Sequence, residues 1–159
     1  MERRLVGQGW FAMAAHVLAL LARSPDGYPS AHLASSVNTH AVFLRKVVAR
    51  LVRTGLVDAK EGRDGGYRLA RPADRITLAD VYRVMRADGP LPLSPAEPNP
   101  SCAVGSGMRA ALTEVASRAE DQLLRELERH TIADLSHHAV ALGNFPERDT
   151  GGDRQPAPV

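Results

Sequence analysis

The chain has 159 residues, 44% of them hydrophobic and 24% charged, which is the size and balance of one folded domain with an appended element. Its single cysteine, Cys102, excludes an intrachain disulfide and a zinc site built from several cysteines of one chain. The net charge of +2 is unevenly spread, because residues 1–89 hold 14 Lys and Arg against 8 Asp and Glu while residues 91–159 hold 6 against 10, so a polyanionic partner is expected for the first part alone.

The first predicted helix runs from Gln8 to Ala22. Arg3 and Arg4 precede it, as basic residues precede the apolar segment of a secretion signal. Polar residues interrupt the apolar stretch, however, and its apolar residues recur at the three- and four-residue steps of an amphipathic helix. No run in the chain reaches the length needed to span a bilayer. We therefore expect a cytoplasmic protein without a membrane segment.

Residues 30–54 predict a helix-turn-helix. A short helix runs from Ser30 to Val37, with Ser30 as its expected N-cap. Asn38 and Thr39 form a tight turn, and a second helix continues to Thr54. Either turn residue is suited to cap the second helix. In such a motif the second helix enters the major groove of DNA.

The second helix of this motif has one apolar and one cationic face. Four cations and no acid lie between Thr39 and Thr54. We predict that Thr39 and His40 make contacts at the helix N-terminus, and that three cations reach bases or phosphates, namely Arg45, Lys46 and Arg50. The alternative is an ordinary amphipathic helix whose charges are solvated. The predicted inner face holds Leu44, Val47, Val48 and Leu51, and the outer face holds Thr39, Val42, Lys46 and Arg53.

Two short predicted strands follow, over residues 56–60 and 67–70, joined by a glycine-rich loop. Such a hairpin behind a helix-turn-helix makes it winged. Gly65 and Gly66 permit positive φ and a close approach of the backbone to phosphate, and Arg63 is placed to enter a narrow minor groove. Glu61 and Asp64 oppose a phosphate contact. They keep open an alternative, a winged-helix protein-interaction module without DNA binding.

The remaining residues predict two further helical regions and a linker. A helix opens after Thr77, its expected N-cap, with Asp80 completing a capping box, and ends near Arg86. Residues 87–106 hold five of the eleven prolines and form a linker that carries Cys102. A long helix over residues 107–130 and a short one over residues 132–142 follow, and residues 143–159 are expected to be a disordered tail.

The long helix carries an apolar stripe that one chain cannot cover. A coiled-coil-like contact with a second copy is the simplest solution, so we expect a homodimer. The predicted fold is mostly α with a small two-stranded wing. Its units are a winged helix-turn-helix (1–86), a linker (87–106), a dimerisation region (107–142) and a tail (143–159). The stripe consists of Leu112, Val115, Ala119, Leu123 and Leu127, extended by Met108.

Three further features have open interpretations. Cys102 is a small buried packing residue, a redox-sensing thiol, or a ligand shared across a dimer, in decreasing order of preference. Solvated surface positions are favoured over a zinc or nickel site for His130, His137 and His138, since adjacent histidines on a helix point in different directions. Trp10 is favoured as an aromatic anchor in the core over a position beside an effector pocket.

With these motifs in place, the chain resembles the Rrf-two (Rrf2) family of bacterial winged-helix regulators, the family of IscR and NsrR. The resemblance covers Val6 to about Leu135. Its most specific parts are Thr54-Gly55-Leu56-Val57, the run from Gly62 to Pro72, and Ile76-Thr77-Leu78-Ala79-Asp80-Val81. It implies a homodimer with a long dimerisation helix, a palindromic operator on double-stranded DNA, and transcriptional regulation, most often repression.

Two departures from the family pattern limit what the resemblance implies. Cluster-binding members carry three cysteines between the wing and the dimerisation helix, whereas this chain has Cys102 alone, so an iron–sulfur cluster is not expected and no other cofactor is implied. Glu61 stands where several relatives have arginine. No nucleophile–base pair, phosphate loop or metal-ligand spacing occurs, so we do not expect an enzyme.

Overall fold

The computed structural model describes residues 9–60, 62, 65–86 and 98–143. Within these ranges the chain is mostly helical, with a small two-stranded sheet, as the sequence predicts. The elements in order are α1 (Trp10–Leu21), α2 (Ser30–Val37), α3 (Ala41–Arg53), β1 (Val57–Lys60), β2 (Gly66–Leu69), the 3-10 helix η2 (Ala73–Arg75), α4 (Leu78–Met85), α5 (Gly105–Leu127) and α6 (Ile132–Leu142). None of the described helices is both long enough and apolar enough to cross a membrane.

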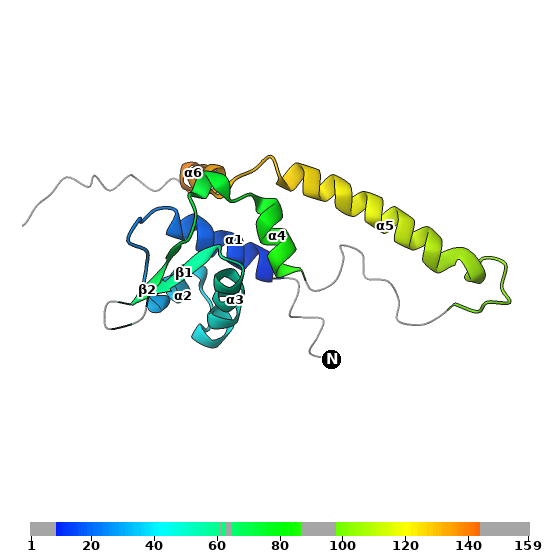
Figure 1. Cartoon of the computed structure of the whole chain (residues 1–159), viewed down its shortest axis with the longest axis horizontal. Coiled ribbons are helices and arrows are strands. Elements are labelled where there is room, and N and C mark those ends of the chain that lie inside the picture. The colour runs from blue at the N-terminus through cyan, green and yellow to red at the C-terminus, as the bar shows by residue number, and fades with distance from the viewer. Residues whose placement is uncertain (1–8, 61, 63–64, 87–97, 144–159) are drawn as a thin grey trace, which may run out of the picture.

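Helix α1 is the centre of the core. It contacts α2, α3, α4, α6 and β2, so it has neighbouring elements on several sides (Figure 1). Val17 and Leu18 have no exposed surface at all. The inner face of α3 packs against this helix with four fully or almost fully buried side chains, confirming the predicted set of Leu44, Val47, Val48 and Leu51.

The turn between α2 and α3 differs from the prediction at its cap. Asn38 has a left-handed backbone (φ 52°) and closes α2, after which the Thr39 N–H donates to the carbonyl of Ala34 at 3.1 Å. The N-cap of α3 is therefore His40, which makes no side-chain capping hydrogen bond. The prediction that Asn38 or Thr39 caps α3 is wrong, because both residues are used to end α2.

Strand β2 of the wing also pairs with the loop before α2, near the end of the strand that follows the hairpin loop. Strands β1 and β2 pair antiparallel, with Val57 opposite Leu69 and Lys60 opposite Gly66. Tyr28 forms an additional bridge to Tyr67, in which each backbone N–H donates to the other residue's carbonyl at 2.9 Å. The wing is therefore anchored to the helix-turn-helix through the backbone as well as through the chain connection.

Helix α6 returns to the winged-helix core, although the sequence groups it with the dimerisation helix. Its first residue, Ile132, is fully buried, and its N–H donates to the carbonyl of Ile76 at 2.8 Å. The buried hydroxyl of Ser136 donates to the carbonyl of Ala19 in α1 at 2.9 Å. A backbone bridge between Thr77 and Thr131 places the starts of α4 and α6 side by side.

Helix α5, in contrast, extends away from this core (Figure 1). None of its residues is buried in the chain. Two ion pairs connect this region to α4 and its C-cap. Arg83 of α4 binds Glu128, the C-cap residue of α5, at 2.5 Å, and Arg86, the C-cap residue of α4, binds Glu120 of α5. It begins at Gly105, two residues before the predicted start, and most of the predicted linker (87–97) lies outside the described residues, as do residues 144–159 of the predicted tail.

Matching capping boxes begin α4 and α6. The predicted box at Thr77 and Asp80 is confirmed, since each side chain accepts a hydrogen bond from the other residue's backbone N–H, at 3.1 and 3.0 Å. Thr131 and Asp134 repeat this arrangement at α6. There, hydrogen bonds from the side chain and the backbone of Thr131 lower the pKa of Asp134 below its ordinary value.

This pKa shift predicts how the stability of the α6 cap depends on pH. A carboxylate whose folded-state pKa is lowered stabilises the fold above its unfolded-state pKa and loses that contribution as the pH falls through the folded-state value. We expect Asp134→Ala to unfold more readily than the wild type in urea at pH 7, with the difference shrinking below about pH 4.

Thr113→Ala serves as the control, because Thr113 is exposed inside α5 and caps no helix. Its difference from the wild type should not depend on pH in this range. A stability difference for Asp134→Ala that stays constant from neutral to acidic pH would contradict the assigned role of the carboxylate.

Candidate nucleic-acid interface

The outer face of α3 presents cations to solvent. Arg45, Lys46 and Arg53 are exposed, and Ala49 lies exposed between the last two. At the N-terminal end His40 is exposed at the N-cap and Thr39 is half-buried beside it, and the contacts of both residues with DNA stay a prediction. The helix therefore combines a buried apolar face with an outer face whose side chains are free to reach a partner.

The surface beside α3 is hollowed as well as basic. A depression of about 600 Å³ extends along α3 to the wing, where Ala59 and Tyr67 line it. Four of its nine lining residues are cations and none is an acid. A concave surface with one sign of charge concentrates counter-ions of the opposite sign, which suits a phosphate backbone. The full lining is Trp10, Arg45, Lys46, Ala49, Arg50, Val52, Arg53, Ala59 and Tyr67.

Arg50, although predicted to contact DNA, has partners inside the protein. Its guanidinium lies over the ring of Trp10, 4.9 Å from the centroid, and donates a hydrogen bond to the carbonyl of Met85 at 3.3 Å. Met85 is the last residue of α4, where cations are favoured by the exposed helix carbonyls. Arg50 thus joins α3 to α1 and α4, and its role as a phosphate contact stays a prediction.

Trp10 is an aromatic anchor of the core, as predicted. It is 7% exposed and makes an edge-to-face contact with Phe43 of α3, at 5.6 Å between ring centroids. Its indole Nε1 is buried without a hydrogen-bond partner among the described residues. The faces and edges of the ring are therefore used to fix α3 against α1.

Gly65 and Gly66 do not have the positive φ that the sequence led us to expect. The positive φ in this loop belongs to Gly62 (φ 108°) and not to Gly65 or Gly66. A Cβ on Gly65 would lie 2.7 Å from the carbonyl oxygens of Gly62 and Lys60, and one on Gly66 would lie 2.7 Å from the carbonyl oxygen of Tyr28. Both positions are glycine because protein backbone passes close to them, and their contact with phosphate stays a prediction.

Other wing residues extend the list of candidates. Arg63, Glu61 and Asp64 lie outside the described residues. Lys60, which was not among the predicted contacts, is exposed at the end of β1. Arg68 on β2 is also exposed, but it forms an ion pair with Asp58 at 3.4 Å. Lys60 could have been predicted from the sequence as a contact, because it is a cation at the end of the strand that leads into the wing loop.

Cys102 lies exposed in the turn that precedes α5. The prediction that it is a buried packing residue is wrong, because this turn stands away from the core. Backbone hydrogen bonds, first from Gly105 and then from Val104, lower the pKa of its thiol. An exposed thiol with a lowered pKa is suited to oxidation, and its role as a redox sensor stays a prediction.

The three C-terminal histidines are exposed, and His130 has a local partner. His130 lies 3.3 Å from a carboxylate oxygen of Glu126, one turn earlier in the chain. His137 and His138 are adjacent on α6, where His137 faces the region of Asp134.

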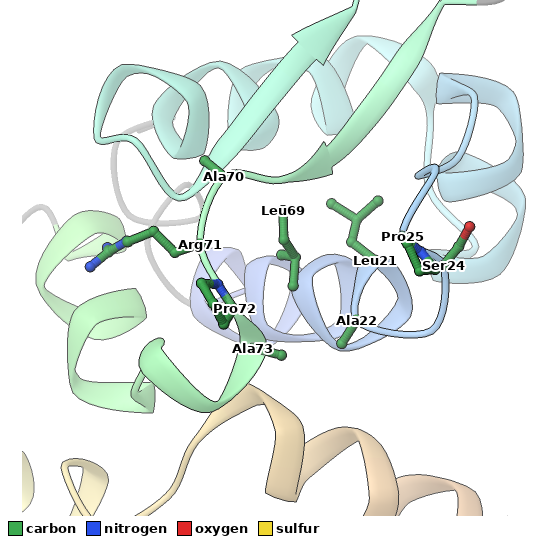
Figure 2. A pocket seen from close by; sticks show the side chains of 9 residues that line it. All are labelled: Leu21, Ala22, Ser24, Pro25, Leu69, Ala70, Arg71, Pro72 and Ala73. Atoms are coloured by element: carbon green, nitrogen blue, oxygen red, sulfur yellow. The ribbon is translucent and has the colours of Figure 1, made fainter.

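A second hollow, of about 350 Å³, lies between the end of α1 and the strand that leaves the wing (Figure 2). Leu21 and Leu69 point toward each other in its middle, and Arg71 extends away from the other labelled side chains. The labelled side chains offer no set of polar groups that converge on one point, so this hollow does not have the features of a specific ligand site.

Comparison with known proteins gives a consistent result. The model of the Rrf2 family, described as iron-dependent transcriptional regulators, matches residues 10–138. The chain is 30% identical over 127 residues to YwnA of Bacillus subtilis, named as an HTH-type transcriptional regulator, covering 80% of this chain and 94% of that protein. It is 33% identical over 144 residues to Rv1287 of Mycobacterium tuberculosis, which has the same kind of name, covering 91% and 84%.

The structure of T. potens IscR is similar to this one, with a TM-score of 0.63 at 20% sequence identity, covering 86% of this chain and 90% of that one. At this identity the likeness shows the fold alone. The fold it shows is the winged helix with an extended helix beyond it.

The iron in the family's description has no matching set of donor atoms here. Cys102 is the one cysteine of the sequence, and among the described residues no group of three His, Cys, Asp or Glu is placed to hold a metal ion. An iron site built from the side chains of one copy therefore does not fit the part of the chain that the structure describes.

The different surroundings of Lys46 and Arg50 predict different effects on DNA binding. Lys46→Ala should reduce the salt dependence of binding, lowering the slope of log K against log salt by about one unit, because an exposed phosphate contact is lost. Arg50→Ala should weaken binding without changing this slope, because its guanidinium fixes α3 from inside. Fluorescence anisotropy over a salt series measures both effects.

The matched control is Arg125→Ala, which removes an exposed cation from α5 and should change neither the affinity nor the slope. If Arg50→Ala lowered the slope as much as Lys46→Ala, Arg50 would have to leave its internal partners and contact phosphate.

The lowered pKa of Cys102 predicts that its alkylation depends on pH differently in the folded and the unfolded protein. Since the thiolate is the reactive form, the rate of reaction with iodoacetamide should rise at lower pH in the folded protein than in the same protein unfolded in urea. Cys102→Ser supplies the background rate. Equal pH midpoints for the folded and unfolded protein would show that the turn before α5 does not stabilise the thiolate.

Proposed function

Because the chain belongs to the Rrf2 family and is a DNA-binding transcriptional regulator, we propose that it acts as a homodimer that represses transcription from a palindromic operator. The observation that carries this proposal is the exposed cationic outer face of α3, a helix whose inner face is fixed in the core. Repression is the role most frequent in the family, and the cytoplasm is the compartment in which such a regulator meets its DNA.

The proposal of a homodimer rests on the apolar face of α5. Met108, Leu112, Val115 and Leu123 are between 36% and 50% exposed, and they recur at the steps that place them on one side of the helix. Ala119 is exposed on the same side and Leu127 is half-buried. A contiguous apolar stripe of this length is unfavourable in water, and an identical stripe on a second copy is complementary to it by symmetry.

A two-fold dimer gives the two reading helices a defined spacing. Each α3 would enter the major groove at one half-site, and the half-sites would lie roughly 34–36 Å apart, which is one turn of DNA. The exposed cations beside α3 would then contact phosphates, and the wing would contact the backbone next to each half-site.

The competing function, a protein-interaction module, depended on Glu61 and Asp64, which lie outside the described residues. Membership of a family of transcriptional regulators favours DNA as the partner. We further propose that this regulator uses no iron–sulfur cluster of the three-cysteine kind, because its sequence holds one cysteine.

The proposed function predicts tight binding to one short DNA segment and dependence on the dimer. The full-length protein would be titrated by fluorescence anisotropy against duplexes tiled across its own upstream region, at two salt concentrations. We expect one duplex to bind well above the rest with a steep salt dependence, and Leu112→Glu to be monomeric in sedimentation and to lose this selectivity.

Ser117→Glu is the control, since Ser117 is exposed on the opposite side of α5 from the stripe. It should remain dimeric and bind as the wild type does. A wild-type protein that is monomeric yet selective would contradict the dimer, and a protein that binds no duplex at low salt would contradict the whole proposal.

A further inference from the structure

We propose that Val42 is a specificity-determining residue, which reads the C5-methyl group of one thymine in each half-site of the operator. This inference rests on the proposed function and adds the chemistry of one base contact to it. It arises from a side chain that the fold does not use.

The first observation is the exposure of Val42. Among the described residues of the winged-helix part (9–60, 62 and 65–86), it is the one large hydrophobic side chain that is mainly exposed, at 64%. The other exposed large hydrophobic side chains lie outside the winged-helix part, on α5, at its N-cap (Val104) and at the end of α6 (Leu142). Those on α5 belong to the stripe that a second copy would cover.

The second observation is the position of Val42 on α3. It is the second residue of the helix, and Lys46, Ala49 and Arg53 come after it at four-, seven- and eleven-residue steps. At these steps the four side chains form one ridge along α3. This ridge is opposite the buried face. In a helix-turn-helix, the N-terminal residues of the reading helix are the ones that contact base edges.

The chemistry of the two groups is complementary. Valine has no hydrogen-bonding group, so it cannot read donors or acceptors on a base edge. The C5-methyl group of thymine is the apolar feature of the major-groove edge, and small apolar side chains are its usual partners. The β-branched side chain is also stiff, which keeps its two methyl groups in a fixed place.

The fold itself gives no reason for valine at this position. A valine that is 64% exposed contributes little apolar burial, and its helix propensity is lower than that of alanine. On the other side, Arg45 and Lys46 supply attraction to phosphate one turn later, but such contacts carry no base information. A desolvated apolar contact beside them supplies that information.

The test uses the duplex that binds tightly in the tiling experiment. Each thymine in it is replaced in turn by deoxyuridine, symmetrically in both half-sites, which removes only the C5-methyl group. We expect one position at which the wild type loses about three- to five-fold in affinity per half-site, the size expected for one methyl group taken from an apolar contact. Val42→Ala should bind the unmodified duplex more weakly and show no further loss at that position.

Val104→Ala is the matched control, because Val104 has almost the same exposure, 63%, at the start of α5. It should keep the full response to deoxyuridine. The inference would be overturned if Val42→Ala lost affinity at the same deoxyuridine positions as the wild type, or if the wild type lost affinity at none of them. In either case selective binding to one duplex would leave the proposed function intact. Binding to none of the tiled duplexes would overturn the proposed function first.

Discussion

The burial of α1 is the constraint on which the rest of the structure depends. Seven of its twelve residues are buried, so it must be covered on most of its surface, and α3, α4 and α6 each supply part of that cover. The reading helix is therefore positioned from its inner face by contacts with α1. Trp10 extends this contact to the flank of α3, where Phe43 meets its ring edge-to-face and Arg50 lies over it. The outer face is left free for a partner because the inner face and one flank are committed.

The same core fixes the direction in which α5 leaves. The ion pair between Arg83 and Glu128 is about half exposed, and a pair of this kind contributes about 0–1 kcal/mol. Full burial of Ile132 contributes more, about 2 kcal/mol, and the hydrogen bonds across the Thr77–Thr131 bridge hold the backbone beside it. The junction between α5 and α6 is thus held mainly by apolar burial, and the ion pairs of Arg83 and Arg86 add polar contacts. A dimer formed through α5 would transmit its geometry to the reading helix through this junction.

Local signals predicted most of the fold, and contacts distant in sequence account for most of the differences. The capping box at Thr77, the two strands of the wing and the inner face of α3 follow from residues within a few positions of each other. The partners of Arg50, by contrast, come from residues 10 and 85, and no helical pattern could identify them. The role of Gly66 depends on Tyr28, which lies in the loop between α1 and α2. Exposure at Cys102 depends on how the turn before α5 stands relative to the core, which the sequence around it does not specify.

The bridge between Tyr28 and Tyr67 bears on how this wing can change during evolution. Gly27 (φ 82°) and Gly66 lie on the two sides of the bridge, and a Cβ on either would collide with the backbone opposite, at 2.1 Å and 2.7 Å. The start of β2 therefore tolerates neither a side chain at these two positions nor a shift in register, which would remove the pairing at 2.9 Å. Insertions and deletions between β1 and β2 leave the bridge untouched. Divergence in this part of the protein should accordingly accumulate in the length and composition of the hairpin loop, while its attachment to the helix-turn-helix stays constant.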